Sequence, residues 1–191
     1  MFKASFLAIV VVAASIKIQA QGVINFANIG AGLNAPVFDV DGATKLAGPA
    51  FQAQVYVGSS TDESSLTAVS PKEPFLSNGG YFNAGTRAVP GFPPGSRPFF
   101  QVRVWEAAGG ASYDAAMTAG AKYGKSTVFQ FADTGGLAGP GPPGGPPPVL
   151  LGLTSFSLVP EPSAVALGAV GGAILLLLRR VSKTMRRSMS L

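Results

Sequence analysis

Two closely spaced carboxylates are the first feature of the chain that could carry chemistry. Asp39 and Asp41 precede Gly42, an arrangement that resembles the opening of a calcium-binding loop. A complete loop of that kind needs further oxygen ligands and a glutamate at its twelfth position, where Ala50 stands. Aspartates before a glycine are also typical of an ordinary turn, because their side chains accept hydrogen bonds from nearby backbone N–H groups. We therefore predict a turn, with Asp39 and Asp41 as a weak calcium candidate, and expect no cofactor.

Patterns typical of catalysis are sparse. The adjacent acids Asp62 and Glu63 could act as an acid–base pair, but their polar surroundings favour a solvated loop pair. Residues 139–144 match G-x-G-x-x-G, yet proline fills the gaps, whereas a phosphate-binding loop needs backbone N–H groups and a following helix. The chain has no histidine, which removes the commonest general base and transition-metal ligand. We expect a protein that is not an enzyme.

Two aromatic residues lie among polar ones and could bind sugars. Trp105 and Tyr56 are expected on the polar faces of their strands, where exposed rings could stack on a carbohydrate. Packing under a loop or a second sheet is the simpler interpretation, and we favour it. An exposed strip formed by both rings would distinguish a carbohydrate-binding protein from one in which the rings only support the fold.

The elements that would position these residues are short strands separated by turns. In residues 50–57 and 99–106 apolar and polar side chains alternate, which places the two sets on opposite faces of a sheet. Further strands are expected at 22–27, 36–39, 44–46, 66–69, 81–89, 126–132 and 153–158. One helix is expected at 112–122, with Ser112 as N-cap and Asp114 in its first turn. This spacing predicts an all-β fold, an antiparallel β-sandwich of the jelly-roll or Ig-like type.

A stretch rich in glycine and proline, residues 134–148, interrupts the body of the chain. We interpret it as a long loop within one domain, residues 21–158, with 153–158 as the closing strand. The alternative is that the stretch ends the domain and that the last strand belongs to a stalk.

An uncharged apolar run follows the body, and a basic segment follows the run. Residues 164–178 contain fifteen residues without a polar side chain, and five Lys or Arg residues come after them. As a helix the run would span about 22 Å, short of the ~30 Å hydrocarbon core unless flanking residues extend it. A buried core helix is the alternative, but the cations favour a transmembrane helix at about 164–181. Their excess places the C-terminal end in the cytoplasm.

The N-terminal residues have the pattern of a secretory signal peptide. A lysine at position 3 precedes an apolar core at 4–16, and a cleavage site is expected between Ala20 and Gln21. An uncleaved anchor is the alternative, although thirteen apolar residues are few for a membrane span. We predict residues 1–20 to be the signal peptide, recognised by the Sec export machinery.

These ends give the chain a resemblance to a known group of exported proteins. Pro160, Glu161 and Pro162, followed by the apolar run and by Arg179 and Arg180, resemble the PEP-CTERM sorting tail, here residues 159–191. The resemblance implies recognition of the Pro-Glu-Pro motif by an exosortase-like membrane processing enzyme, with the arginine pair as the membrane stop. It also implies a Gram-negative bacterium, an intermediate anchored in the inner membrane, and a final location at the cell surface or in an extracellular polysaccharide matrix.

The charge of the whole chain is set by these terminal segments. The formal net charge is +5, whereas residues 21–158 carry seven basic and eight acidic side chains. Nucleic-acid binding is therefore not expected. The chain has no cysteine, so disulfides play no part. We expect an exported cell-surface or matrix protein of structural or adhesive type. The alternative is a carbohydrate-binding module for exopolysaccharide, and a secreted hydrolase is the least expected.

Overall fold

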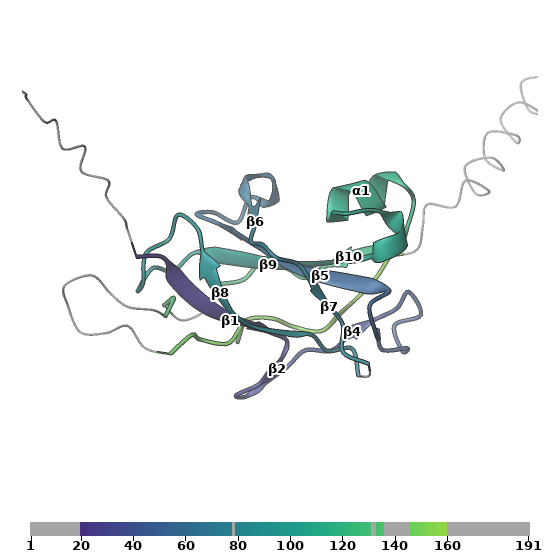
Figure 1. Ribbon diagram of the computed structural model, residues 1–191, viewed down its shortest axis with the longest axis horizontal. Coiled ribbons are helices and arrows are strands. Elements are labelled where there is room, and N and C mark those ends of the chain that lie inside the picture. Colours follow the sequence, from purple (N-terminus) through teal and green to yellow (C-terminus); the bar gives the residue numbers. More distant parts are fainter. Residues whose placement is uncertain (1–19, 78, 131–132, 136–145, 160–191) are drawn as a thin grey trace, which may run out of the picture.

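The fold is mostly β-sheet, as the sequence predicts. The computed structural model describes residues 20–77, 79–130, 133–135 and 146–159. Within these residues short strands dominate, accompanied by one α-helix and two 3₁₀ turns. Figure 1 shows them in tiers, with the longest strands in the middle, α1 on one side of them and β1, β2 and β4 on the other.

The middle tier is a five-stranded sheet built on two long strands. β5 (Phe51–Gly58) and β9 (Phe99–Glu106) pair antiparallel along their full eight residues. β10 (Tyr123–Lys125) extends the sheet beyond β9, and β6 (Thr67–Ala68) and β7 (Glu73–Pro74) both pair with β5. The two strands that alternate most clearly in the sequence are therefore the centre of the fold.

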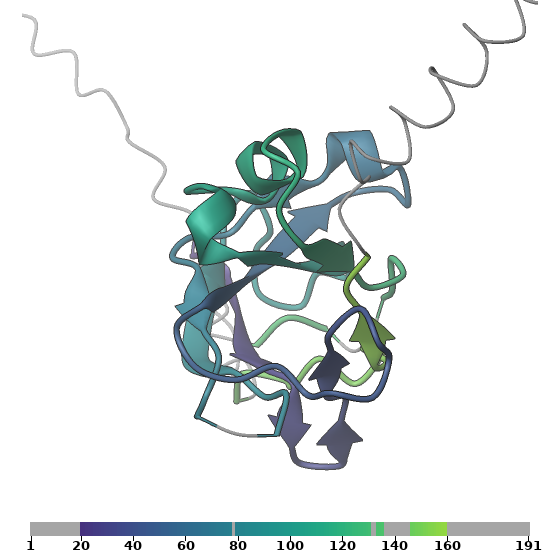
Figure 2. The same ribbon diagram turned by 90° about the vertical axis from the view of Figure 1, so that its right-hand side faces the viewer.

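A two-stranded ribbon covers one face of this sheet. β1 (Gly22–Ala27) pairs antiparallel with β8 (Asn83–Val89), with an irregularity between Asn25 and Ala27. Both views place this ribbon below the sheet (Figures 1 and 2). Apolar side chains from both tiers form one buried core, which includes Ile24, Phe26, Val55, Val57, Phe82, Phe100, Val102, Leu150, Leu153 and Leu158.

Two further pairs lie on the same side as the ribbon. β2 (Ile29–Gly30) and β3 (Leu33–Asn34) form an antiparallel hairpin, whereas β4 (Val37–Phe38) and β11 (Phe156–Ser157) are parallel. The predicted antiparallel arrangement is therefore wrong for β11. Parallel neighbours need a crossover connection, and here almost the whole body lies between the two strands. The segment 153–158 nevertheless packs into the core.

Some predicted elements are shorter or differ in kind. Residues 126–130 form no named strand, since Phe129 makes only an isolated bridge to Phe100. Residues 44–46 likewise contribute one bridge, from Lys45 to Phe38. The helix α1 (Tyr113–Thr118) begins as predicted, because the Ser112 hydroxyl accepts the Ala115 N–H at 3.2 Å. It ends four residues earlier than predicted, just before Gly120, whose φ of +76° is a left-handed conformation that closes helices.

The described body begins and ends at opposite ends of its long axis (Figure 1). Ala20 and Val159 are both exposed. No helix in the described residues is long and apolar enough to cross a membrane. The predicted transmembrane helix at about 164–181, and nearly all of the predicted signal peptide, lie outside the described residues.

Candidate functional site

A polar cluster lies on the face of β9 opposite the apolar core. Gln101, Arg103 and Trp105 share this face, which the alternation in the sequence marks as the polar face of the strand. The exposed fractions of these residues are nevertheless only 0, 9 and 0 %, and for Trp105 this agrees with the favoured interpretation, packing beneath another segment. The segment around η1 (Glu63–Ser65), helix α1 and the chain that follows β10 lie against this face, and Figure 1 shows α1 on that side of the sheet.

Arg103 is at the centre of this cluster. Its Nε donates to Gln101 Oε1 at 2.8 Å, and its Nη2 donates to the backbone carbonyl of Glu63 at 3.1 Å. The guanidinium also lies 4.0 Å from the ring centroid of Tyr56 and 5.3 Å from that of Tyr113. Burial raises the pKa of both phenols, and raises the pKa of Tyr113 to about 12. The rings are therefore neutral surfaces that face a cation.

Glu63 connects the cluster to solvent. Its Oε1 accepts the Gln101 Nε2–H at 2.9 Å, and its Oε2 forms an ion pair with Lys125. The hydrogen bond from Lys125 is the main cause that lowers the pKa of Glu63. The Glu63 side chain is 42 % exposed, in keeping with the solvated position predicted from the sequence, and it also has fixed partners. A cation, an amide and the backbone fix its position.

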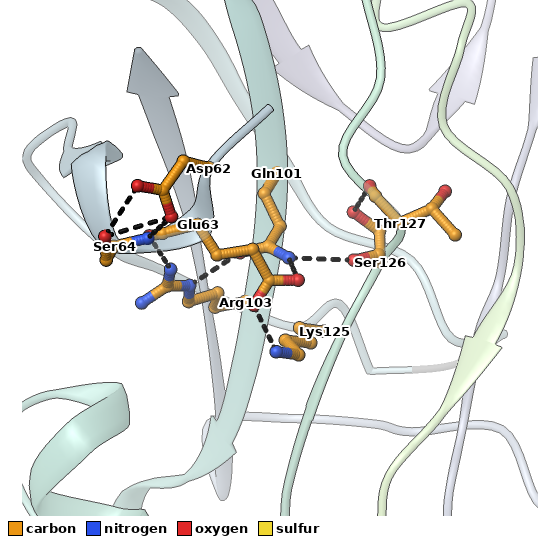
Figure 3. A network of polar contacts seen from close by, with 8 residues as sticks. All are labelled: Asp62, Glu63, Ser64, Gln101, Arg103, Lys125, Ser126 and Thr127. Atoms are coloured by element: carbon orange, nitrogen blue, oxygen red, sulfur yellow. Dashed lines mark hydrogen bonds and ion pairs between the residues drawn. The ribbon is translucent and has the colours of Figure 1, made fainter. Parts of the chain in front are cut away.

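Its neighbour Asp62 has a separate, local role. Asp62 Oδ1 accepts the Ser64 N–H at 3.0 Å and so caps η1. Hydrogen bonds from Ser64 lower the pKa of Asp62, which is fully exposed as predicted. The two acids point to different partners and do not form a dyad (Figure 3).

Ser126 holds the chain after β10 against β9. The Val102 N–H donates to Ser126 Oγ at 3.0 Å, and Gln101 Nε2 donates to the Ser126 carbonyl at 3.1 Å. The Ser126 hydroxyl in turn donates to the Thr127 carbonyl at 2.8 Å. The proton of the Ser126 hydroxyl is therefore donated to a backbone carbonyl, and the carboxylate of Glu63 is paired with Lys125. The arrangement satisfies buried polar groups and fastens loops to the sheet, a structural role.

The aromatic residues considered for sugar binding are both buried. Trp105 has no exposed surface and donates its Nε1–H to the Gly110 carbonyl at 3.1 Å, next to α1. Tyr56 is 6 % exposed because Arg103 covers its ring. The two rings therefore form no exposed strip for a sugar, and packing beneath other elements is the interpretation that agrees with the structure.

The aspartates considered for calcium form a closed turn. Asp41 accepts hydrogen bonds from the N–H groups of Ala43 and Thr44 at 2.9 and 2.8 Å, and from the Thr44 hydroxyl at 2.5 Å. These bonds, led by that of the Thr44 hydroxyl, lower the pKa of Asp41 to about 2. Asp39 instead pairs with Lys122 at 2.8 Å. Among the described residues no group of three or more acidic, histidine or cysteine side chains is placed to hold a metal ion.

The residues expected to direct export lie at or beyond the ends of the described body. Ala20 and Gln21 are exposed. Pro160, Glu161, Pro162, Arg179 and Arg180 lie outside the described residues.

The chain is fixed up to the last residue before the Pro-Glu-Pro motif. The Leu158 N–H donates to the Phe38 carbonyl at 2.9 Å, and the Val159 N–H donates to the Tyr123 carbonyl at 2.7 Å. Leu158 is 3 % exposed and belongs to the core. The motif therefore follows directly after an ordered edge of the fold.

No protein-family model matches this chain, and neither a curated protein nor a solved structure gives a significant match. Its own residues and geometry are therefore the basis for proposing a function.

Proposed function

We propose that this is an exported, non-enzymatic protein of structural or adhesive type, displayed at the cell surface or in an extracellular matrix. The observation that carries the proposal is the closed body between two exposed ends. Apolar side chains cover one face of the central sheet, and the Arg103 cluster occupies the other. The polar groups of that cluster bond to one another instead of converging on an open site. Such a domain is suited to being displayed.

We further propose that the two tiers constitute a β-sandwich. The common apolar core between β5, β9, β1 and β8 supports this assignment. The edge of β1 is bridged by Gly135 and Val149, which leaves less of that strand free to pair with another chain. A body of this kind can be exported and keep its fold without disulfides.

The terminal segments would carry out the sorting. The signal peptide 1–20 would direct Sec export, with cleavage between Ala20 and Gln21. The helix at about 164–181 would then enter the inner membrane, with Arg179 and Arg180 on the cytoplasmic side. Pro160, Glu161 and Pro162 would lie at the outer membrane–water boundary, within reach of an exosortase-like enzyme. Processing there would release or transfer the body.

Intact mass of the protein from its native host, in membrane and extracellular fractions, tests this proposal. We expect the extracellular form to lack residues 1–20 and the region beyond about Pro162. A Glu161→Gln variant is expected to accumulate as a membrane-held form that keeps its tail. Ser157→Ala, an exposed change just before the motif, is the matched control and should be processed normally. A native protein found only in the membrane with Leu191 intact would overturn sorting and leave an ordinary anchor.

A further inference from the structure

The end of the body from which the tail leaves has a defined surface. We call this surface the exit face, and it consists of residues 39–45, Lys122, Tyr123 and Val159. Its parts are held together by the Val159–Tyr123 hydrogen bond at 2.7 Å and by the Lys122–Asp39 ion pair at 2.8 Å. Figure 2 looks onto this end, where β4 and β11 lie at the front.

The tether between the exit face and the apolar run is very short. Only residues 160–163 lie between Val159 and the start of the run. Four residues span at most about 14 Å when fully extended. The headgroup region of a bilayer takes up roughly 5–8 Å of that distance on each side. Fully extended, the tether therefore holds Val159 no more than about 6–9 Å above the headgroups, which is less than the ~14 Å radius of gyration of a domain of this size.

The composition of the exit face is compatible with headgroups but does not by itself draw the body to them. Val40 and Val159 are 39 and 43 % exposed, and Lys45, which follows Val40 along the chain, is exposed as well. Against these, Asp41 keeps its negative charge down to about pH 2, because its folded pKa is that low. Lys122 is already paired with Asp39. Charges of both signs largely offset each other here, so the tether determines the contact.

We infer that the exit face rests on the phospholipid surface for as long as the protein is held by its tail. This inference depends on the proposed membrane anchoring and adds the orientation of the body to it. The end where β1 begins then points away from the membrane, and the exit face is covered by lipid until processing. Any processing enzyme must approach Pro160, Glu161 and Pro162 from the side, between the body and the bilayer.

Single cysteine variants of the full-length chain test the orientation. The chain has no cysteine, so each introduced thiol is unique. Val40→Cys lies on the exit face, and Ala88→Cys is an exposed position on β8, opposite Val23 of β1. Each variant is labelled with a fluorophore and reconstituted in phosphatidylcholine vesicles that contain headgroup spin-labelled lipid. We expect quenching at position 40 to exceed that at position 88 several-fold, and equal or reversed quenching would overturn the inference.

A variant with a longer tether shows whether the short tether or a direct affinity of the exit face for lipid causes the contact. A flexible Gly/Ser insert of about ten residues between Val159 and Pro160 raises the average end-to-end distance of the tether from roughly 11 Å to roughly 20 Å, and its full extension far more. In that variant we expect quenching at position 40 to fall to the level at position 88. Undiminished quenching would overturn the claim that the tether sets the contact. If the protein does not float with the vesicles in a density gradient, the proposed anchoring itself is overturned. If it floats but position 40 is not quenched more than position 88, only the orientation is overturned.

Discussion

The guanidinium of Arg103 lies 4.0 Å from the ring centroid of Tyr56, on a face of the central sheet that is closed to solvent. This pair explains how a strand with alternating polar residues can be buried on both sides. The aromatic ring and the hydrogen bonds to Gln101 and Glu63 provide the partners that a buried cation requires. The cluster therefore joins η1 to the sheet in place of an apolar contact.

Replacing Arg103 with lysine is expected to destabilise the body by about 2 kcal/mol. Lysine keeps the charge but cannot donate to Gln101 and the Glu63 carbonyl with the fixed geometry of a guanidinium. Urea unfolding measures the change. Arg97→Lys is the matched control, because Arg97 pairs with Asp133 at the surface and its side chain is 68 % exposed. If both substitutions lower the free energy of unfolding equally, the buried contacts of Arg103 contribute no more to stability than the exposed ion pair of Arg97.

Asn28 provides a second test, on the other side of the fold. Its side chain is fully buried, donates to the carbonyls of Ala35 and Gly80 at 2.8 and 2.9 Å, and accepts the Phe82 N–H at 2.8 Å. Asn28→Ala removes three hydrogen bonds and takes away the side-chain partner of the buried Ala35 carbonyl and of the buried Phe82 N–H, whereas the Gly80 carbonyl still accepts the Val37 N–H at 3.0 Å. We therefore expect a loss of about 3 kcal/mol in the free energy of unfolding.

Asn34→Ala is the comparison for Asn28. Asn34 is exposed and its side chain accepts the Tyr81 hydroxyl at 2.9 Å. Because water can replace that bond, we expect a loss below about 1 kcal/mol by the same chemical denaturation measurement. A loss as large as that of Asn28→Ala would contradict the role assigned to the buried amide.

Adjacent leucines test whether the segment after the glycine- and proline-rich stretch supports the core. Leu150 is fully buried, whereas Leu151 is 56 % exposed. Leu150→Ala is expected to cost about 3 kcal/mol, from lost burial and the cavity left behind. Leu151→Ala should cost less than about 0.5 kcal/mol. A small effect at position 150 in urea unfolding would mean that this segment is only a stalk.

The turn around Asp41 predicts a specific dependence of stability on pH. The folded pKa of Asp41 is about 2, below the ordinary aspartate value of 3.8, so the ionised form is favoured by folding. Its contribution is therefore complete above about pH 4 and is lost as the pH falls toward 2. Asp41→Asn should lower the urea midpoint near neutral pH, and the difference from the natural chain should shrink by pH 2. A constant difference across this range would contradict the assignment.

Thr44→Val is the complementary variant. It removes the hydroxyl that donates to Asp41 Oδ2, which is the largest cause of the lowered pKa. The pKa of Asp41, followed by NMR titration of its side-chain carboxyl, should move back toward 3.8. An unchanged pKa would mean that the backbone N–H groups alone hold the carboxylate.

The sequence predicts the strands whose side chains alternate over many residues, and it predicts the start of α1 from Ser112. It also predicts strands at 36–39 and 153–158, where β4 and β11 lie, but it does not predict that they pair in parallel, because this pairing joins segments far apart in the sequence. The parallel direction of that pair comes from the tertiary arrangement alone. The pairing of short strands is therefore the part of this fold that pattern reasoning misses.

The Arg103 cluster was missed for a related reason. Period-two alternation shows which residues share a face of β9, but it does not show whether another segment covers that face. The cover comes from η1 and α1, whose own sequences are polar enough to be taken for solvated loops or an ordinary surface helix. The signal that could have found the cluster is the set of a glutamine, an arginine and a tryptophan on one strand face, since large rings rarely stay exposed.

The pairing of β4 with β11 also determines when the body can fold. Val37 lies opposite Phe156, so β4, near the beginning of the body, can pair only when β11, at the end of the body, is available. Contacts so distant in sequence form slowly and late. In a chain that crosses the membrane N-terminus first, as proposed here, the core is completed only after residues 149–158 emerge. The tail follows at once, so completion of the fold and arrival of the membrane segment are nearly simultaneous, and a truncated export product would lack both.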